Sequence, residues 1–176
     1  LNGGAAPFFT HQVAWRAVIP CEPGADPIAR VYMGAGRHLV SYPLRGGRER
    51  KIVAVEERRR WVEESWSLED DPLTLRAAFA GFCPEVQGWL SQVQTPGLWG
   101  LFRHPVAPRW HGQGAAILGD AVHPTLPFLA QGAVMSIEDG VVLGRCLDQY
   151  DDPKEALLRY EAARVDRTSR MVRGAK

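Results

Sequence analysis

The chain has 176 residues, of which 45% are hydrophobic and 23% charged, so it is long enough to bury a core and too apolar to remain disordered. Lysine and arginine together number 21 against 20 acidic residues, and this near balance gives no argument for nucleic acid or an anionic membrane as a partner. The 3 cysteines lie far apart without a CxxC pair, which argues against a disulfide framework or a structural zinc site and favours a reducing cytoplasm. No apolar run approaches the length needed to cross a bilayer.

The first part of the sequence predicts β-strands. Residues 12–19 are rich in β-forming side chains and end at a proline. Two further runs, 29–33 and 37–42, flank Gly34-Ala35-Gly36, a short loop whose glycines permit positive φ. A fourth run, 51–56, follows a glycine-containing turn, so the last three runs predict an antiparallel meander.

The next part predicts a helix and then a short strand. Asp71 supplies an N-cap and Pro72 a first-turn proline, whose missing N–H costs nothing there. Apolar residues recur at helical spacing after them, and we expect the helix to end at Pro84. A short strand is expected near 98–102.

The last part predicts one more strand and two helices. The apolar run 115–118 predicts a small buried strand that ends in Gly119-Asp120. A long helix is expected from Gln131 to about Leu147. Asp152 then opens a final helix with a capping-box pattern, in which the acid is the N-cap and Glu155 follows three residues later.

The most informative stretch runs from Gly119 to Ala133. It reads as a strand, a carboxylate at the strand's C-terminal end, a proline-containing loop and the glycine-containing start of an apolar helix. A carboxylate there can accept hydrogen bonds from sugar hydroxyls, and a helix N-terminus offers free N–H groups to an anionic or electron-rich ligand. Crevices beyond strand C-termini are where nucleotide cofactors sit in α/β folds. A Gly-Asp pair alone would indicate only an ordinary strand–loop–helix connection.

The whole string closely resembles the second flavin-binding motif of the single-component aromatic-ring hydroxylases, the group of p-hydroxybenzoate, salicylate and 3-hydroxybenzoate hydroxylases. The resemblance continues into Ile137-Glu138-Asp139, which matches the family's Ile-Glu-Asp. Further landmarks follow the family's order over nearly the entire chain: Ala14-Trp15-Arg16, Trp61-Val62-Glu63-Glu64-Ser65-Trp66, Arg103-His104-Pro105 and Tyr160-Glu161-Ala162-Ala163-Arg164. The chain therefore resembles the C-terminal part of an FAD-dependent aromatic hydroxylase.

The resemblance implies an α+β fold like that of p-hydroxybenzoate hydroxylase. Residues 1–112 would form mainly a substrate-binding β-sheet region with a helical insert, and the sheet over about 12–56 would be the floor of a substrate pocket. Residues 113–176 would form the C-terminal strand–loop–helix part of an FAD-binding α/β domain. The family's first flavin motif, GxGxxG, and its middle Asp-Gly motif are absent from the sequence. The chain, which starts at Leu1 rather than at a methionine, reads as beginning just beyond the middle motif.

An FAD site is the second implication of the resemblance. Asp120 would bind a ribitol or ribose hydroxyl, and Gly119 would allow the close approach. Pro127 would lie near the flavin ring, where the reduced cofactor reacts with oxygen. Arg103 could approach the flavin diphosphate, although a structural ion pair explains it equally well. The backbone N–H groups of Gly132, Ala133 and Val134 would face the pyrimidine edge of the flavin. There they would stabilise charge on the reduced ring.

A candidate catalytic pair lies in the meander. His38, Val40 and Tyr42 alternate along one strand and therefore share one face of it. The HxxxY spacing resembles the substrate-pocket pair of the 3-hydroxybenzoate and hydroxynicotinate hydroxylases, in which the imidazole helps to deprotonate the substrate hydroxyl. A phenolate is a far better nucleophile than a phenol, and a histidine with a pKa near neutrality can take the proton. Without the resemblance, the pair would indicate only an exposed strand face.

Other polar residues carry weaker interpretations. Arg16 could meet a substrate carboxylate, although a structural ion pair explains it equally well. Glu138 and Asp139 are expected to serve the helix start and local packing rather than acid–base chemistry. We expect His123 to satisfy backbone groups beside the loop.

The resulting hypothesis is a flavoprotein monooxygenase that hydroxylates a salicylate- or hydroxybenzoate-like phenolic acid with FAD, NADH or NADPH, and O2. The sequence leaves the oligomeric state open, a homodimer being one alternative. Two other functions also stay open: a non-catalytic folded fragment of such an enzyme, and a flavin-dependent isoprenoid epoxidase or reductase. The histidines lack zinc-ligand spacing and no GxSxG elbow is present, which disfavours metal-dependent and serine hydrolases.

Overall fold

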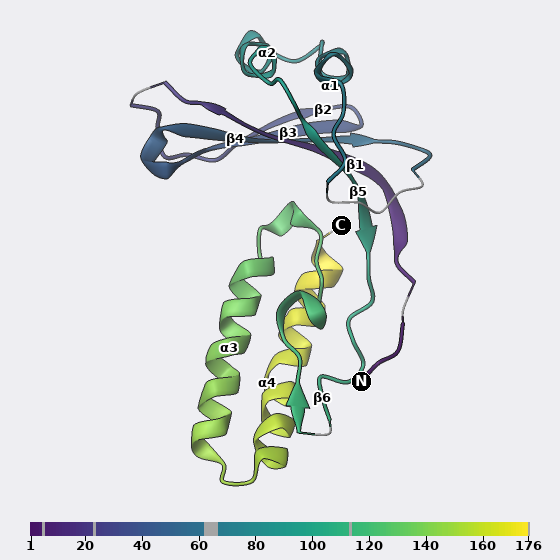
Figure 1. Cartoon of the computed structure of the whole chain (residues 1–176), viewed down its shortest axis with the longest axis vertical. Coiled ribbons are helices and arrows are strands. Elements are labelled where there is room, and N and C mark those ends of the chain that lie inside the picture. The colour runs from purple at the N-terminus through teal and green to yellow at the C-terminus, as the bar shows by residue number, and fades with distance from the viewer. Residues whose placement is uncertain (5, 23, 62–66, 113, 176) are drawn as a thin grey trace. The chain divides into compact units, whose positions relative to one another are not determined.

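The computed structural model describes residues 1–4, 6–22, 24–61, 67–112 and 114–175 of the chain. These residues form two compact units (Figure 1), of which unit 1 comprises Leu1–Phe8 with Phe102–Lys176 and unit 2 comprises Phe9–Leu101. Within the described residues, no helix combines the length and the apolar character needed to span a bilayer.

Unit 2 is built on a five-stranded sheet in the order β2-β3-β4-β1-β5. Its strands are β1 (Phe8–Pro20), β2 (Arg30–Gly34), β3 (Arg37–Leu44), β4 (Glu49–Glu57) and β5 (Gly97–Arg103), with a 3-10 turn, η1 (Arg45–Gly47), between β3 and β4. The pairs β2–β3, β3–β4 and β1–β4 are all antiparallel. The predicted meander and the antiparallel sheet over residues 12–56 are therefore confirmed.

One face of this sheet is covered by two helices, α1 (Pro72–Ala78) and α2 (Pro84–Ser91), as Figure 1 shows. The core between them contains Trp15, Leu39 and Ile52 from the sheet, together with Phe79 and Leu90. These side chains are at most 2% exposed. Because side chains alternate along a strand, the neighbours of these residues point to the other face of the sheet, which we call the open face.

The helix expected after Asp71 is present but shorter than predicted. Asp71 caps α1 by accepting from the Leu73 N–H, at 2.8 Å, and Pro72 occupies the first turn as expected. Pro84, however, does not end this helix. It opens α2, because a proline without an N–H fits the first turn of a new helix as well as it stops an old one.

Unit 1 is dominated by a helical hairpin, α3 (Gly132–Gln149) and α4 (Pro153–Gly174), and both helices agree with the sequence prediction. Asp152 caps α4 through Lys154 N–H, but Glu155 bonds to Arg159 one turn later. Preceding the hairpin are a two-stranded ladder, β6 (His111–Gly112) and β7 (Ala115–Ala116), and two 3-10 turns, η2 (Gly119–Ala121) and η3 (Pro127–Leu129).

The expected buried strand at 115–118 is wrong in extent and burial. Only Ala115 and Ala116 pair as a strand, and Leu118 is 38% exposed. A four-residue apolar run is too short to distinguish a strand from an irregular segment. Asp120 consequently sits in a 3-10 turn rather than at the end of a strand.

The division into units differs from the expected boundary at 112/113. Trp110 is fully buried in the core of unit 1 beside Val122 and Tyr160, so the segment before residue 113 packs with the helical hairpin. Asn2 also joins unit 1 because its side chain exchanges two hydrogen bonds with the backbone of Arg109. Of the family landmarks, the run Trp61–Trp66 lies outside the described residues from residue 62 onwards.

Candidate functional site

The segment from Gly119 to Gln131, which we call the Gly-Asp loop, connects β7 to the long helix α3. Gly119 has φ +60°, in the left-handed region that favours glycine, and a Cβ built there would lie 2.7 Å from Ser136 Oγ of α3. Glycine is therefore required at this position on two grounds, backbone conformation and close packing. The turn it begins exposes the next residue, Asp120, at the surface of unit 1.

The loop brings Asp120 to the N-terminus of α3. A Cβ built on Gly132, the first helical residue, would lie 4.0 Å from Asp120 Oδ1 and 3.3 Å from Thr125 Cγ2. No side chain caps this end of α3, and the first intrahelical bond is donated by Met135 to the carbonyl of Gln131. The N–H groups of Gly132, Ala133 and Val134 therefore precede the hydrogen-bonded ladder and lie beside an exposed carboxylate. Two parts of the predicted cofactor site are thus brought together.

Pro127 and Arg103 occupy other places in unit 1. Pro127 opens the 3-10 turn η3, is exposed, and is followed by Ala130 in a left-handed conformation at φ +52°. Arg103 donates to the carbonyl of Ala175 at 2.7 Å, while its buried Nε has no partner among the described residues. A buried donor without a partner is unusual in a folded protein, and this one is shielded from solvent.

The open face of the unit 2 sheet carries His38 and Tyr42. In the pairing of β3 with β4, His38 lies opposite Val55, Val40 opposite Val53, and Tyr42 opposite Lys51. Four residues along a strand separate His38 from Tyr42, which is about 13 Å between their Cα atoms. The two side chains therefore flank Val40 and could contact opposite ends of one ring-sized ligand, but not a single atom.

Two cations share this face. Arg16 of β1 lies opposite Val53 and stacks on Trp99, with its guanidinium carbon 4.5 Å from the ring centre. Lys51 lies between Tyr42 and Val18 in the register. Burial lowers the pKa of Lys51, and the nearby charge of Arg16 lowers it further. Two cations held this close together favour an anionic partner such as a carboxylate.

His38 also borders a small hollow. The hollow measures about 140 Å³ and is shared with Gln12, Met33 and Glu57 among others. Ligand pockets usually measure about 300–1,000 Å³, so this hollow can form only one wall of a substrate site. Burial lowers the pKa of His38, which keeps the imidazole neutral and able to accept a proton at neutral pH. Tyr42 does not line this hollow.

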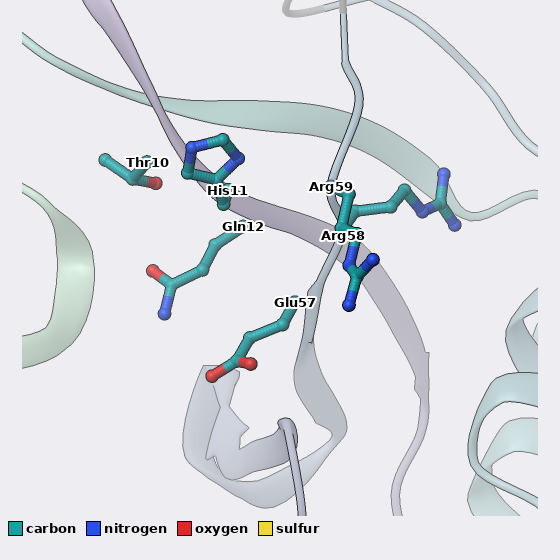
Figure 2. A pocket seen from close by; sticks show the side chains of 6 residues that line it. All are labelled: Thr10, His11, Gln12, Glu57, Arg58 and Arg59. Atoms are coloured by element: carbon teal, nitrogen blue, oxygen red, sulfur yellow. The ribbon is translucent and has the colours of Figure 1, made fainter.

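A second hollow near the same end of the sheet was not anticipated from the sequence. It measures about 260 Å³ and is polar (Figure 2), being lined by Thr10, His11, Gln12, Glu57, Arg58 and Arg59. His11 has φ +60°, a left-handed conformation that is rare inside a strand. No pattern in the sequence marks this strained residue, and none of the predicted site residues lines the hollow.

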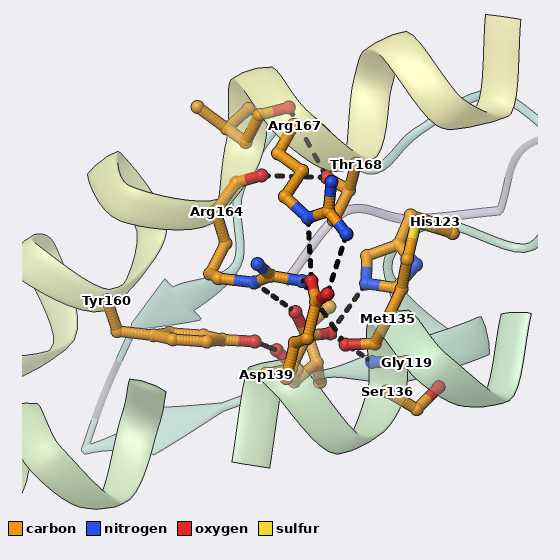
Figure 3. A network of polar contacts seen from close by, with 12 residues as sticks. Gly119, His123, Met135, Ser136, Asp139, Tyr160, Arg164, Arg167 and Thr168 are labelled. Atoms are coloured by element: carbon orange, nitrogen blue, oxygen red, sulfur yellow. Dashed lines mark hydrogen bonds and ion pairs between the residues drawn. The ribbon is translucent and has the colours of Figure 1, made fainter. Parts of the chain in front are cut away.

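A buried ionic cluster beneath the Gly-Asp loop was also missed. Asp139 of α3 is fully buried and accepts from Gly119 N at 2.9 Å and from Arg164 Nε at 2.7 Å, and it contacts His123 Nε2 at 2.5 Å (Figure 3). We call these four residues the Asp139 cluster. The expectation that His123 satisfies backbone groups is wrong, because its partner is a carboxylate. The expected role of Glu138 and Asp139 at the helix start is wrong, because α3 begins at Gly132 and has no acid in its first turn. The expected role of Asp139 in local packing agrees with its full burial.

Glu138 extends the cluster towards solvent. It forms ion pairs with Arg167 at 2.6 Å and with Arg164 at 2.8 Å. The hydrogen bond from Arg167 is the main reason why the pKa of Glu138 falls to about 2. The signal that could have revealed this cluster was an acid pair on one helix and two arginines three residues apart on the next.

Comparison with known proteins gives one family match and several relatives. A family model described as FAD binding domain matches residues 41–175. A 3-hydroxybenzoate 6-hydroxylase from Polaromonas naphthalenivorans (strain CJ2) is 34% identical over 176 residues, which cover 96% of this chain and 43% of that protein. The chain therefore spans less than half the length of this relative.

Solved structures agree with the observed fold. A salicylate hydroxylase in complex with its substrate superposes with a TM-score of 0.83 at 22% identity, over 98% of this chain and 47% of that one. Klebsiella pneumoniae HpxO complexed with FAD and uric acid also gives 0.83, at 27% identity, over 97% and 44% of the two chains. The expected α+β fold of the p-hydroxybenzoate hydroxylase type is confirmed.

Proposed function

Because this chain belongs to the FAD binding domain family, whose model matches residues 41–175, we propose that it supplies half of the cofactor site and one wall of the substrate site in a flavoprotein monooxygenase. The reaction is hydroxylation of a phenolic aromatic acid with FAD, NADH or NADPH, and O2. The observation that carries the proposal is the exposed Asp120 carboxylate beside Gly132, at an uncapped helix N-terminus. The carboxylate can accept hydrogen bonds from sugar hydroxyls, and the helix N-terminus can bind an electron-rich ring edge. A flavin nucleotide carries both groups close together.

Four elements of unit 1 fit the cofactor. Asp120 would accept hydrogen bonds from hydroxyls of the ribityl chain. The N–H groups of residues 132–134 would face the pyrimidine edge, where the helix dipole stabilises negative charge. Pro127 would contact the ring, and the guanidinium of Arg103 would approach the diphosphate. When bound, FAD would supply the redox chemistry that links the nicotinamide donor to O2.

The open face of unit 2 fits the substrate. Val40 and Val53 offer an apolar floor for an aromatic ring, and the cations Arg16 and Lys51 lie to one side of it. His38 takes the phenolic proton onto an imidazole nitrogen. Burial lowers the pKa of His38, so the imidazole is unprotonated at neutral pH before the transfer. Tyr42 donates to an oxygen at the other end of the ring. The 3-hydroxybenzoate relative supports a hydroxybenzoate-type substrate.

The test uses the flavoprotein that contains this chain, with Asp120→Ala and a matched control, Asp151→Ala, which removes an exposed carboxylate between α3 and α4. Loss of charge-assisted hydrogen bonds costs about 1.5–3 kcal/mol each, so Asp120→Ala should weaken FAD binding at least about tenfold. The control should keep its flavin. Flavin absorbance after dialysis measures retention, and product analysis with 3-hydroxybenzoate and salicylate measures hydroxylation.

Three outcomes separate the alternatives. A colourless wild-type protein that binds no FAD would support the non-catalytic fragment. A yellow protein that hydroxylates neither acid but oxidises an isoprenoid olefin would support the epoxidase. Equal flavin retention in Asp120→Ala and wild type would remove Asp120 from the cofactor site.

A further inference from the structure

We infer that Asp139 is a positioning residue for the cofactor, since it pins the backbone of Gly119 and thereby orients Asp120 at the α3 N-terminus. This inference rests on the proposed function and names a residue that does not itself contact the cofactor. Asp139 lies about two turns inside α3, is fully buried, and points at the loop rather than at solvent.

The contact between Asp139 and Gly119 is specific in geometry. The Gly119 N–H donates to Asp139 Oδ2 at 2.9 Å from a residue held at φ +60°. That N–H belongs to the peptide that joins Leu118 to Gly119, so the bond fixes the residue immediately before Asp120. Rotation about the backbone of Gly119 would swing the Asp120 carboxylate away from Gly132. A hydrogen bond to an ionised carboxylate is roughly twice as strong as a neutral one, which suits a clamp on this turn.

The remaining partners hold Asp139 itself in place. Arg164 of α4 donates its Nε to Asp139 Oδ1 and reaches the Met135 carbonyl at 3.3 Å. His123, at the end of the first turn of the Gly-Asp loop, contacts the same Oδ2 as Gly119. Figure 3 shows the three groups converging on one carboxylate from α4, the loop and the turn. Both ends of the loop's first turn are therefore tied to one atom.

The substitution that breaks this arrangement with the least change in volume is Asp139→Asn. In the unsubstituted protein, each carboxylate oxygen of Asp139 faces only donors. Oδ1 faces Arg164, and Oδ2 faces Gly119 and His123. An amide has one acceptor oxygen and one donor nitrogen, so in either orientation it places a donor against a donor. Glu138→Gln is the matched control, because it removes the same charge from the next residue and a contact to the same Arg164 without touching Gly119.

The experiment measures FAD affinity, melting temperature and amide hydrogen exchange in the flavoprotein that contains this chain. Asp139→Asn should raise the FAD dissociation constant about tenfold or more at temperatures well below melting, whereas Glu138→Gln should stay within about twofold of wild type. Arg164→Lys, which keeps the charge and leaves the Gly119 bond in place, should lower the melting temperature but retain FAD affinity. In the wild type, the Gly119 amide should be among the slowest to exchange, and Asp139→Asn should speed it.

Several results would overturn the inference. Asp139→Asn that melts earlier but binds FAD as wild type does would leave Asp139 with stability alone. Fast exchange of the Gly119 amide in the wild-type protein would also contradict the inference, because it would show that Asp139 does not hold Gly119 in place. This measurement needs no variant, so it decides the question even if Asp139→Asn fails to fold. A protein whose Gly119 amide is protected but which binds no FAD would instead contradict the proposed function. It would still support the hydrogen bond by which Asp139 holds Gly119.

Discussion

In unit 1, the Gly-Asp loop is held by the fully buried carboxylate of Asp139, which has three hydrogen-bonding partners. In unit 2, by contrast, His38, Val40 and Tyr42 are half-buried on a sheet face that the helices α1 and α2 leave uncovered. The first site depends on one ionic cluster for its shape. The second takes its shape from the strand ladder, which is formed by backbone groups that no side-chain change removes. Substitutions should therefore act through geometry and stability in unit 1 and through chemistry in unit 2.

The largest effect should come from His38→Ala. Hydroxylation should slow by about 10²–10⁴-fold, the usual range for a positioned acid–base group, while FAD binding and melting temperature stay unchanged. The reduced cofactor should then release hydrogen peroxide, and higher pH should partly restore coupling because bulk base ionises the phenol. Peroxide formed per nicotinamide oxidised, measured across pH, checks this.

His111→Ala, in unit 1, is the control for loss of a partly buried imidazole and should remain coupled. A His38→Ala protein that stays fully coupled at neutral pH would show that His38 serves only the sheet.

Lys51→Met should have the next largest effect. The side chains have similar size, so the change removes a charge but little packing. If Lys51 meets the substrate carboxylate, the KM for a hydroxybenzoate should rise at least about tenfold, with a much smaller change for a phenol lacking the carboxylate. Lys154→Met on α4 is the matched control. Equal losses with both substrates would contradict the assignment.

Tyr42→Phe should give a smaller change, because it keeps the ring and removes one hydroxyl. A single neutral hydrogen bond contributes about 0.5–1.5 kcal/mol, so kcat/KM should fall about two- to tenfold. Steady-state kinetics with a matched melting curve measures it. A lowered melting temperature with an unchanged kcat/KM would make Tyr42 a packing residue. That result would weaken the contrast between the two units.

Glu138→Gln should have the smallest effect at neutral pH and a characteristic one in acid. Hydrogen bonding by Arg167, above all, lowers the pKa of Glu138 from 4.5 to about 2, so its contribution to stability is present above about pH 4.5 and is lost as pH falls towards 2. The variant should lack this part of the acid dependence. Parallel melting curves from pH 6 to pH 2 would test it, and an unchanged acid profile would argue against the ion pair.

The sheet could be predicted from sequence because each strand carries its own signal. In β3 the β-forming residues predict the strand, but they do not predict which face is buried, because the polar Ser41 is buried and the apolar Val40 is not. The helix start at Pro84 could not be predicted, since proline is compatible with both the end of one helix and the first turn of the next.

The Asp139 cluster shows the limit of local patterns. Its four members come from residues 119, 123, 139 and 164, and only the folded hairpin brings them together. The loop residues named in advance, Asp120 and Gly132, were found through a resemblance, and their proximity is a finding of the structure. The roles of all the predicted site residues, in the cofactor site and in the substrate pair alike, stay predictions.

Strand β2 has a practical consequence for handling the chain. Among the described residues it pairs on one side only, with β3, so its other edge offers unpaired N–H and C=O groups. Two apolar side chains on it are highly exposed, Met33 at 85% and Val31 at 58%. An uncovered apolar edge is a template for strand addition by another molecule, and five residues are enough to begin it. At high concentration we expect aggregation of the isolated chain to start here, and Val31→Lys to delay it.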